Sequence, residues 1–172
     1  LFLVWVINSY NFIDGIDGMA ISVAVFAVAT IALVFFLTSK PFELGTLVLI
    51  LLACLTPFMF LNWPPARIFM GDAGSIFLGY IFGSLILFTT ISGELSIWTW
   101  LVVFGYYIAD TMVTQIMRLI LVKKWYKAHR SHAYQNFARI TGSHRKVVIF
   151  VVVYQLIWLL PLAILTVLRP EL

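Results

Sequence analysis

Five long apolar runs constrain the fold of this chain more than any other feature. As an α-helix, each run is long enough to cross about 30 Å of hydrocarbon, and each is bounded by charged residues, Gly or Pro. The runs do not alternate in polarity as half-buried strands do, and an open sheet could not satisfy its edges in lipid. They cover Met19–Thr38, Leu44–Leu61, Ser75–Ile91, Ile97–Val122 and Val147–Leu168. The sequence therefore predicts an all-α polytopic membrane protein with about five complete transmembrane helices.

The first residues, Leu1–Ile7, are also apolar but span only about 10 Å as a helix. No charged segment precedes them, so they do not resemble a signal peptide. We interpret them as the end of a sixth helix. We expect residues 1–172 to form a single transmembrane domain that is the C-terminal part of a longer chain.

Composition agrees with a membrane protein and excludes an ordinary soluble domain. The chain is 63% hydrophobic and 10% charged, with a mean hydropathy of +1.05. Soluble domains are about half apolar and about a quarter charged. A net charge of +4 would suggest a nucleic-acid partner in a soluble protein. Here the basic residues cluster in one loop, so membrane topology explains them better and we expect no nucleic-acid partner.

The order of the predicted crossings assigns each loop to one side of the membrane. One side holds nine of the eleven Lys and Arg residues, and only Lys40 and Arg169 fall on the other. The positive-inside rule makes the basic side cytoplasmic. The loops on this side are 11–18, 62–74 and 123–146. All three contain polar motifs, so the sequence predicts an active face on the cytoplasmic side.

The first motif places two amides and two carboxylates within ten residues of a membrane boundary. They are Asn8, Asn11, Asp14 and Asp17. A glycine follows each aspartate and allows a tight turn. Asp17 could alternatively act only as a cap of the following helix. Capping needs one carboxylate, however, and does not explain the other three residues.

The second motif runs from Asn62 through Arg67 and Phe69 to Asp72, just before an apolar run. Asp72 is expected near a helix N-terminus, where a negative charge is favourable. A carboxylate here suits Mg²⁺, which takes one or two protein carboxylates and completes its coordination with water and phosphate oxygens. The alternative is a capped turn in which Arg67 serves only membrane topology.

The third motif contains His129, Arg130 and His132 in the basic loop. On a helical turn the two histidines would share one face, with Arg130 beside them. Such a group could bind a pyrophosphate, to which arginine makes bidentate contacts. The alternative is a solvated loop whose cations attract anionic lipid. We interpret His144, which stands apart, as incidental.

Asp110 is a carboxylate inside an apolar run. A charge there is costly and is a functional candidate by default. Thr114 and Arg118 follow at intervals of four residues and would extend a polar stripe toward the cytoplasm. The alternative is a structural polar pair between two helices.

Taken in order, the three motifs resemble a known family. N-x-x-N-F-I-D-G-I-D-G-M-A, N-x-x-x-x-R-I-F-M-G-D-A-G-S and A-H-R-S-H-A-Y-Q resemble the polyprenyl-phosphate N-acetylhexosamine-1-phosphate transferases (glycosyltransferase family 4). The resemblance implies a phosphoglycosyltransferase that moves a HexNAc-1-phosphate from a UDP-sugar to undecaprenyl phosphate and releases UMP. H-R-S-H resembles the subgroup that initiates lipopolysaccharide O-antigen or related cell-envelope polysaccharides. The phospho-MurNAc-pentapeptide translocase of peptidoglycan synthesis is the alternative within the family, and a membrane transporter is the alternative from another class.

The resemblance also implies roles for individual residues. The catalytic residues are Asp14, Asp72, His129 and His132. The substrate-binding residues are Asn8, Asn11, Asp17, Asn62, Phe69 and Arg130, with Phe69 stacking on uracil. Asp72 and Asp14 are the expected ligands of Mg²⁺, with Mn²⁺ as an alternative metal. The site is expected at the cytoplasmic face of the bacterial inner membrane, and the family is compatible with a homodimer.

One element of the family pattern precedes this sequence. The family carries an adjacent aspartate pair in an earlier cytoplasmic loop, which is implicated in catalysis or in binding the lipid phosphate. We therefore expect residues 1–172 alone to be inactive.

Overall fold

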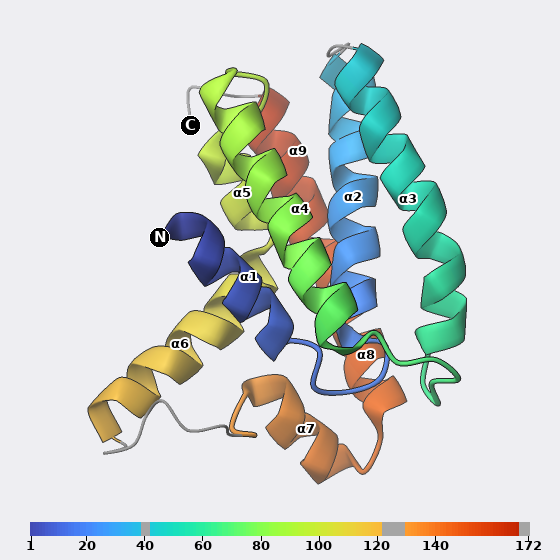
Figure 1. The fold of residues 1–172 in the computed structure, drawn as a ribbon, viewed down its shortest axis with the longest axis vertical. Coiled ribbons are helices and arrows are strands. Elements are labelled where there is room, and N and C mark those ends of the chain that lie inside the picture. Colours follow the sequence, from blue (N-terminus) through green and yellow to red (C-terminus); the bar gives the residue numbers. More distant parts are fainter. Residues whose placement is uncertain (39–41, 122–129, 169–172) are drawn as a thin grey trace.

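A computed structural model describes residues 1–38, 42–121 and 130–168, and the described chain is helical without any strand. The helices are α1 (Phe2–Phe12), α2 (Met19–Thr38), α3 (Phe42–Asn62), α4 (Gly71–Ile91), α5 (Ile97–Val103), α6 (Gly105–Leu121), α7 (Ala133–Thr141), α8 (His144–Tyr154), the π-helical turn η1 (Gln155–Leu159) and α9 (Leu160–Leu168). The predicted all-α class is confirmed (Figure 1).

Four stretches of the described chain are long and apolar enough to cross a membrane. They are Met19–Thr38, Glu43–Asn62, Gly71–Ile91 and His144–Leu168. Each contains or closely matches a predicted run, and the last continues through the π-helical turn η1. The protein is therefore a multi-pass membrane protein, as the apolar runs predicted.

The prediction of one helix over Ile97–Val122 is wrong. The chain leaves helical geometry at Phe104, and Figure 1 shows α6 turning away from α5. Phe104 is buried, and its ring packs 5.1 Å from the ring of Phe82. Gly105 follows, and a Cβ at that position would lie 3.4 Å from the side chain of Leu159. The buried Phe104, followed by Gly105, which is a weak helix former, thus interrupts the apolar run. Val122, the last residue of the predicted helix, lies outside the described residues.

The prediction that 123–146 is a loop is also partly wrong, because α7 and the start of α8 lie within it. Helix α7 is short and amphipathic and buries Tyr134 and Ala138. Helix α8 begins at His144, before the apolar run, because the Ser143 hydroxyl oxygen accepts the Lys146 N–H at 3.3 Å. A capping residue, rather than hydropathy, therefore sets this helix start.

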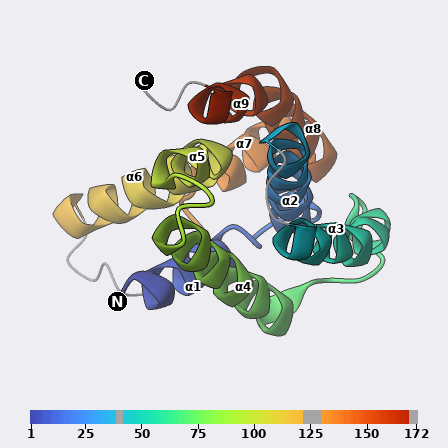
Figure 2. The ribbon, with the colours of Figure 1, turned by 90° about the horizontal axis from the view of Figure 1, so that it is seen from above.

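The core is centred on α2. Seen from above, α2 has α3 on one side and the C-terminal helices α8 and α9 on the other (Figure 2). Most of α2 is buried, whereas little of α3 is buried. The outer face of α3 is apolar, as expected for a helix that contacts lipid.

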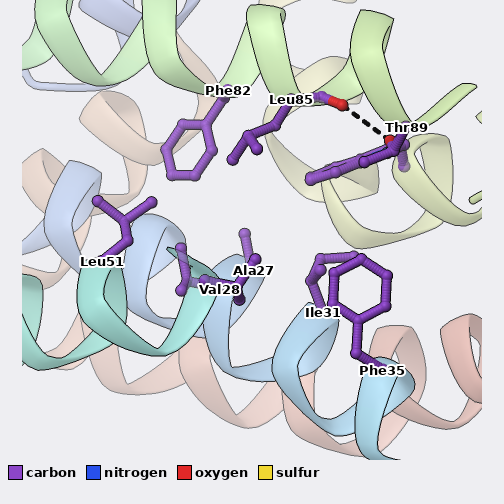
Figure 3. Close-up of a pocket in the computed structure, with 10 residues that line it drawn as sticks. Ala27, Val28, Ile31, Phe35, Leu51, Phe82, Leu85 and Thr89 are labelled. Atoms are coloured by element: carbon purple, nitrogen blue, oxygen red, sulfur yellow. Dashed lines mark hydrogen bonds between the residues drawn. The ribbon is translucent and has the colours of Figure 1, made fainter. Parts of the chain in front are cut away.

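Side chains of α2, α4 and α5 close the middle of this core. Ala27, Val28 and Ile31 face Phe82 and Leu85 across a narrow gap (Figure 3). The remaining volume of about 10 Å³ is no larger than one water molecule, and its walls are almost entirely apolar. The gap is therefore a packing void rather than a ligand site. The polar atoms at its end are paired, since the Thr89 hydroxyl donates to Leu85 O at 2.7 Å and accepts from the Trp100 indole N–H at 2.8 Å.

Helices α1 and α4 approach each other closely because α4 presents a glycine to α1. A Cβ on Gly79 would lie 2.8 Å from the Cα of Ile7, so a larger residue would push the helices apart. Small residues allow this kind of backbone contact between membrane helices. The contact brings the end of α1 beside the start of α4 (Figure 1). As a result, the first and second polar motifs meet.

Candidate active site

The polar motifs gather at one end of the helices. The α1–α2 connection, the α3–α4 connection and helix α7 lie together at the lower end of the molecule in Figure 1, and the α4–α5 connection lies at the upper end. Hydrogen bonds between these segments, given below, confirm that they are in contact. The predicted convergence of the three motifs on one face is therefore observed for those of their residues that the structure describes.

The turn 13–18 is attached to the α3–α4 connection by two side chains. The Asp17 carboxylate accepts the Ala66 N–H at 3.2 Å. The Asn62 side-chain oxygen accepts the Gly18 N–H at 3.1 Å, and its amide nitrogen donates to Ile68 O at 2.8 Å. Asn62 is buried; its oxygen holds the turn 13–18, and its amide nitrogen fixes the side chain to its own connection. The predicted proximity of Asp17 and Asn62 is present, with Asn62 acting as a brace.

The two asparagines of α1 occupy different environments. Asn11 accepts a hydrogen bond of 2.5 Å from the Ser75 hydroxyl in the first turns of α4. Asn8 is exposed, and its amide donates to Val4 O of its own helix at 2.9 Å. The structure thus links Asn11, but not Asn8, to a second polar motif by a described hydrogen bond.

Three carboxylates influence one another at the junction of these loops. The pKa of the Asp14 carboxyl is raised from 3.8 to about 6, mainly by burial. The Gly71 backbone N–H lowers this pKa in part, and the charges of Asp72 and Asp17 contribute to raising it. Asp72 lies exposed in the first turn of α4. A partly buried carboxylate that faces two others is a typical functional site, because a cation relieves the repulsion.

The donor set fits Mg²⁺ better than a metal that needs many protein ligands. Among the described residues, no group of three or more His, Cys, Asp or Glu side chains is arranged to hold a metal ion. Mg²⁺ uses one or two carboxylates and retains several waters. Asp14 and Asp72 offer such a pair at an accessible position, with phosphate oxygens able to complete the coordination.

Phe69 is an aromatic side chain that the fold leaves available on the α3–α4 connection. Its side chain is 73% exposed, although it lies only three residues before Asp72. An exposed ring beside a carboxylate cluster can stack on a planar ligand at little structural cost.

Asp110 and His132 form a contact between α6 and α7 that the sequence did not predict. The two residues are buried, with His132 Nδ1 2.8 Å from one Asp110 oxygen. The other Asp110 oxygen accepts the Ala133 N–H at 2.7 Å. The polar pair between helices, which was one of the two readings of Asp110, is thus present. His129, the other predicted histidine, lies outside the described residues.

Tyr134 connects α7 to the turn that carries Asp14. Its hydroxyl donates to Phe12 O at 2.6 Å, at the end of α1. The ring covers Gly15 so closely that a Cβ on Gly15 would overlap the Tyr134 hydroxyl and lie 2.5 Å from the Gln135 amide nitrogen. Gly15 is therefore required for the packing of α7 against this turn. The sequence shows that a glycine follows Asp14, but it does not show that Tyr134 packs against this glycine.

His144 is not incidental, contrary to the sequence interpretation. Its Nδ1 lies 3.5 Å from the Asp17 carboxylate and 3.4 Å from the Asp17 backbone nitrogen. Capping by Ser143 starts α8 early enough to place His144 there. This contact joins the start of the span His144–Leu168 to the first motif.

A basic groove of about 330 Å³ lies between α7 and the turn 13–18. Arg130 and Arg139 line it from one side, and Gly15 from the other. The Arg139 guanidinium donates to Arg130 O and, at 3.1 Å, to the Asn136 side-chain oxygen, so internal bonds fix its position. The groove is lined both by the predicted phosphate-binding Arg130 and by Gly15, the residue after Asp14, and its arginines suit an anionic ligand.

Comparison with known proteins identifies the family of this chain. Residues 1–90, which contain the first two motifs, match the family model described as "Glycosyl transferase family 4". The chain belongs to glycosyl transferase family 4. This confirms the predicted membership of the polyprenyl-phosphate N-acetylhexosamine-1-phosphate transferase superfamily.

Several curated members of glycosyl transferase family 4 are similar over most of the chain. A Bacillus subtilis protein named "Probable undecaprenyl-phosphate N-acetylglucosaminyl 1-phosphate transferase" is 34% identical over 88% of this chain and 42% of its own length. A "Phospho-N-acetylmuramoyl-pentapeptide-transferase" of Clostridium beijerinckii is 33% identical over 83% of this chain and 42% of its own length. The Streptococcus mutans protein of the same name is 29% identical over 83% of this chain and 40% of its own length. The chain thus spans about two fifths of the length of these relatives.

Proposed function

We propose that the intact protein transfers a HexNAc-1-phosphate from a UDP-sugar to undecaprenyl phosphate and releases UMP. The reaction takes place at the cytoplasmic face of the bacterial inner membrane. The observation that carries the proposal is the meeting of Asp14, Asp17 and Asp72 at one end of the membrane helices, beside a basic groove. A carboxylate cluster for a metal and an adjacent arginine group are the parts that phosphoryl transfer requires. Family membership supports the same reaction class.

The site residues divide into those that hold the metal and those that hold the donor. In this proposal Asp14 and Asp72 would hold Mg²⁺, with Mn²⁺ as a substitute, and the ion would supply positive charge that offsets the charge of the diphosphate. Phe69 stacks on the uracil ring, and Asp17 and Asn11 bind the uridine. Asn8 and Asn62 complete the nucleotide pocket, Asn62 by fixing the two loops that form it.

The basic residues are assigned to the diphosphate. Arg130 makes bidentate contacts to phosphate oxygens from the rim of the groove. His129 and His132 act in catalysis, and His132 does so from a fixed ring position on Asp110. The acceptor phosphate arrives on a lipid, which explains why the site lies where the membrane helices end.

The sugar and the biological process form the finer part of the proposal. The Bacillus subtilis relative is named for transfer of N-acetylglucosaminyl 1-phosphate, and the H-R-S-H motif resembles enzymes that initiate O-antigen synthesis. We therefore propose UDP-GlcNAc, or a 6-deoxy derivative such as UDP-FucNAc or UDP-QuiNAc, as the donor. Peptidoglycan synthesis with a UDP-MurNAc-pentapeptide donor is the second candidate, because relatives of that name are also similar.

The deciding experiment is a donor comparison with the intact purified protein in detergent or nanodiscs. UMP release is measured with undecaprenyl phosphate, Mg²⁺ and each donor in turn. The proposal expects release with a UDP-HexNAc, loss of release on adding EDTA, and a decrease of at least about 100-fold in Asp72→Asn. Faster release with UDP-MurNAc-pentapeptide would favour the second candidate. No UMP release with any of these donors would refute the proposed reaction and favour a transporter.

A further inference from the structure

Asp110 is a buried carboxylate whose oxygens are both bound to residues of another helix. It lies in α6 and is only 7% exposed. Burying a charge is costly unless hydrogen bonds compensate for the lost water. The compensation comes from His132 Nδ1 at 2.8 Å and from the Ala133 N–H at 2.7 Å. Both partners lie at the start of α7, so both of the described hydrogen bonds of Asp110 go to that helix start.

The first consequence concerns the position of α7. Helix α7 begins at Ala133, and the first backbone N–H groups of a helix lack partners within the helix. Asp110 accepts one of them from outside, in the manner of an N-cap residue, and its negative charge faces the positive end of the helix. Tyr134, next along α7, donates to Phe12 O at the turn that carries Asp14. Asp110 and Tyr134 therefore fix α7 relative to the carboxylate cluster.

The second consequence concerns the proton on the His132 ring. An ionised carboxylate only accepts hydrogen bonds, so an ionised Asp110 at 2.8 Å from Nδ1 requires a proton on that nitrogen. In a neutral ring the lone pair is then on Nε2. The rings of Phe12 and Tyr134, with centroids 5.9 and 5.7 Å from that of His132, restrict its rotation. One tautomer and one orientation are thus imposed together.

We propose that Asp110 is a positioning residue of the active site. It holds His132 as the Nδ1–H tautomer and anchors α7, and through α7 it fixes Arg130 and the basic groove next to Asp14. This inference rests on the proposed function, because the rate that Asp110 supports is that of UMP release. A carboxylate that fixes the tautomer and orientation of a histidine is an established device in catalysis, and here the two residues are 22 positions apart on different helices.

The test is Asp110→Asn in the intact enzyme. The side-chain oxygen of asparagine can still accept the Ala133 N–H, which preserves the cap of α7. Its NH₂ group then faces His132 Nδ1 and requires that nitrogen to accept, which moves the proton to Nε2. We expect kcat for UMP release to fall by about 10²–10³-fold, with KM for the UDP-sugar changed by less than about threefold. Asp110→Glu, which again only accepts, is expected to recover at least about tenfold of the lost rate.

The tautomer is read directly by ¹⁵N NMR of histidine-labelled enzyme, with the His132 signal assigned by its loss in His132→Gln. The wild-type ring should be protonated on Nδ1, and the ring in Asp110→Asn on Nε2. Thr111→Val is the matched control, because Thr111 is the next buried polar residue of α6 and its hydroxyl bonds only to carbonyls of its own helix. This control should leave both kcat and the NMR signal unchanged.

The outcomes separate this inference from a purely structural role and from the proposed function. A folded Asp110→Asn enzyme with wild-type kcat, or with reduced kcat but an unchanged tautomer, would overturn the inference. A wild-type ring protonated on Nε2 would overturn it as well, and that measurement needs no variant of Asp110 to fold. If the wild-type enzyme releases no UMP from any donor, the proposed function fails, while the NMR measurement still decides whether Asp110 sets the tautomer.

Discussion

Replacing Gly15 with alanine should loosen α7 from the turn that carries Asp14. The added methyl group would overlap the Tyr134 hydroxyl, and Tyr134 is 1% exposed, so its ring cannot swing into solvent. Moving the ring breaks the 2.6 Å hydrogen bond to Phe12 O, which costs about 0.5–1.5 kcal/mol. Forcing a methyl group into a filled space costs about 1–3 kcal/mol more. We therefore expect Gly15→Ala to destabilise the protein by about 2–4 kcal/mol.

The clash can be relieved by removing the atom that causes it. In Tyr134→Phe the nearest ring atom would lie 3.2 Å from the new methyl group, a contact that a shift of a few tenths of an ångström relieves. The other close atom, the Gln135 amide nitrogen at 2.5 Å, is the end of a flexible side chain that can move away. Gly15→Ala should therefore cost less than half as much in a Tyr134→Phe background as in the wild type. Because residues in contact do not act independently, this pair forms a double-mutant cycle with a positive coupling energy.

Thermal unfolding of the intact protein, followed by tryptophan fluorescence, measures these differences. For a domain of this size each kcal/mol corresponds to about 2–4 °C in Tm. Gly45→Ala is the control, since a Cβ on Gly45 meets no atom within 4 Å and lies inside α3, where alanine is the better helix former. If Gly15→Ala unfolds at the wild-type temperature, or if its effect is the same with and without Tyr134→Phe, the packing of α7 on this turn is misassigned.

Three further predictions address the loops of the site. Burial, together with the charges of Asp72 and Asp17, raises the pKa of Asp14 from 3.8 to about 6, so its ionisation destabilises the fold as pH rises from about 4 to about 6. Asp14→Asn should therefore raise Tm at about pH 7.5 without Mg²⁺ but not at about pH 4, and equal shifts at both pH values would contradict this. Asn62→Ala leaves the Gly18 N–H and Ile68 O without their buried partner, and it should lower stability by about 2–4 kcal/mol in thermal unfolding. A loss below about 1 kcal/mol would show that water replaces the amide. Phe69→Leu should raise KM for the UDP-sugar several-fold in the UMP-release assay. Because the ring is exposed, Tm should be unchanged, and a shift in Tm instead would show that Phe69 is a packing residue.

Hydropathy predicted the spans of this protein well because lipid imposes a length on each helix. The run Met19–Thr38 has the same bounds in the sequence and in the structure. The break at Phe104 was not predictable in this way, since both halves are apolar and the interruption depends on contacts with Phe82 and Leu159. Helix α7 was missed for the opposite reason: it is short and polar, and only its buried face with Tyr134 marks it as a packed helix.

The candidate site was predictable in its parts more than in its connections. The aspartates at 14, 17 and 72 stand in motifs that the predicted order of membrane crossings places on one side of the membrane. The pairing of Asp110 with His132 and of Asp17 with His144 joins residues 22 and 127 positions apart, and no local pattern specifies such distances. The contact of Asp110 with His132 exists only because the fold places α7 beside α6.

The wide sequence separation of these contacts has a consequence for the order in which the protein is made. Asp17 meets Ala66, 49 residues later, and meets His144 only after another 78 have been synthesised. Because a chain emerges from the ribosome with its N-terminal part first, the carboxylate loops can associate before α7 and α8 exist. The acidic part of the face can thus assemble before the residues of α7 and α8 are synthesised. The basic groove, which α7 and His144 help to line, can form only after that.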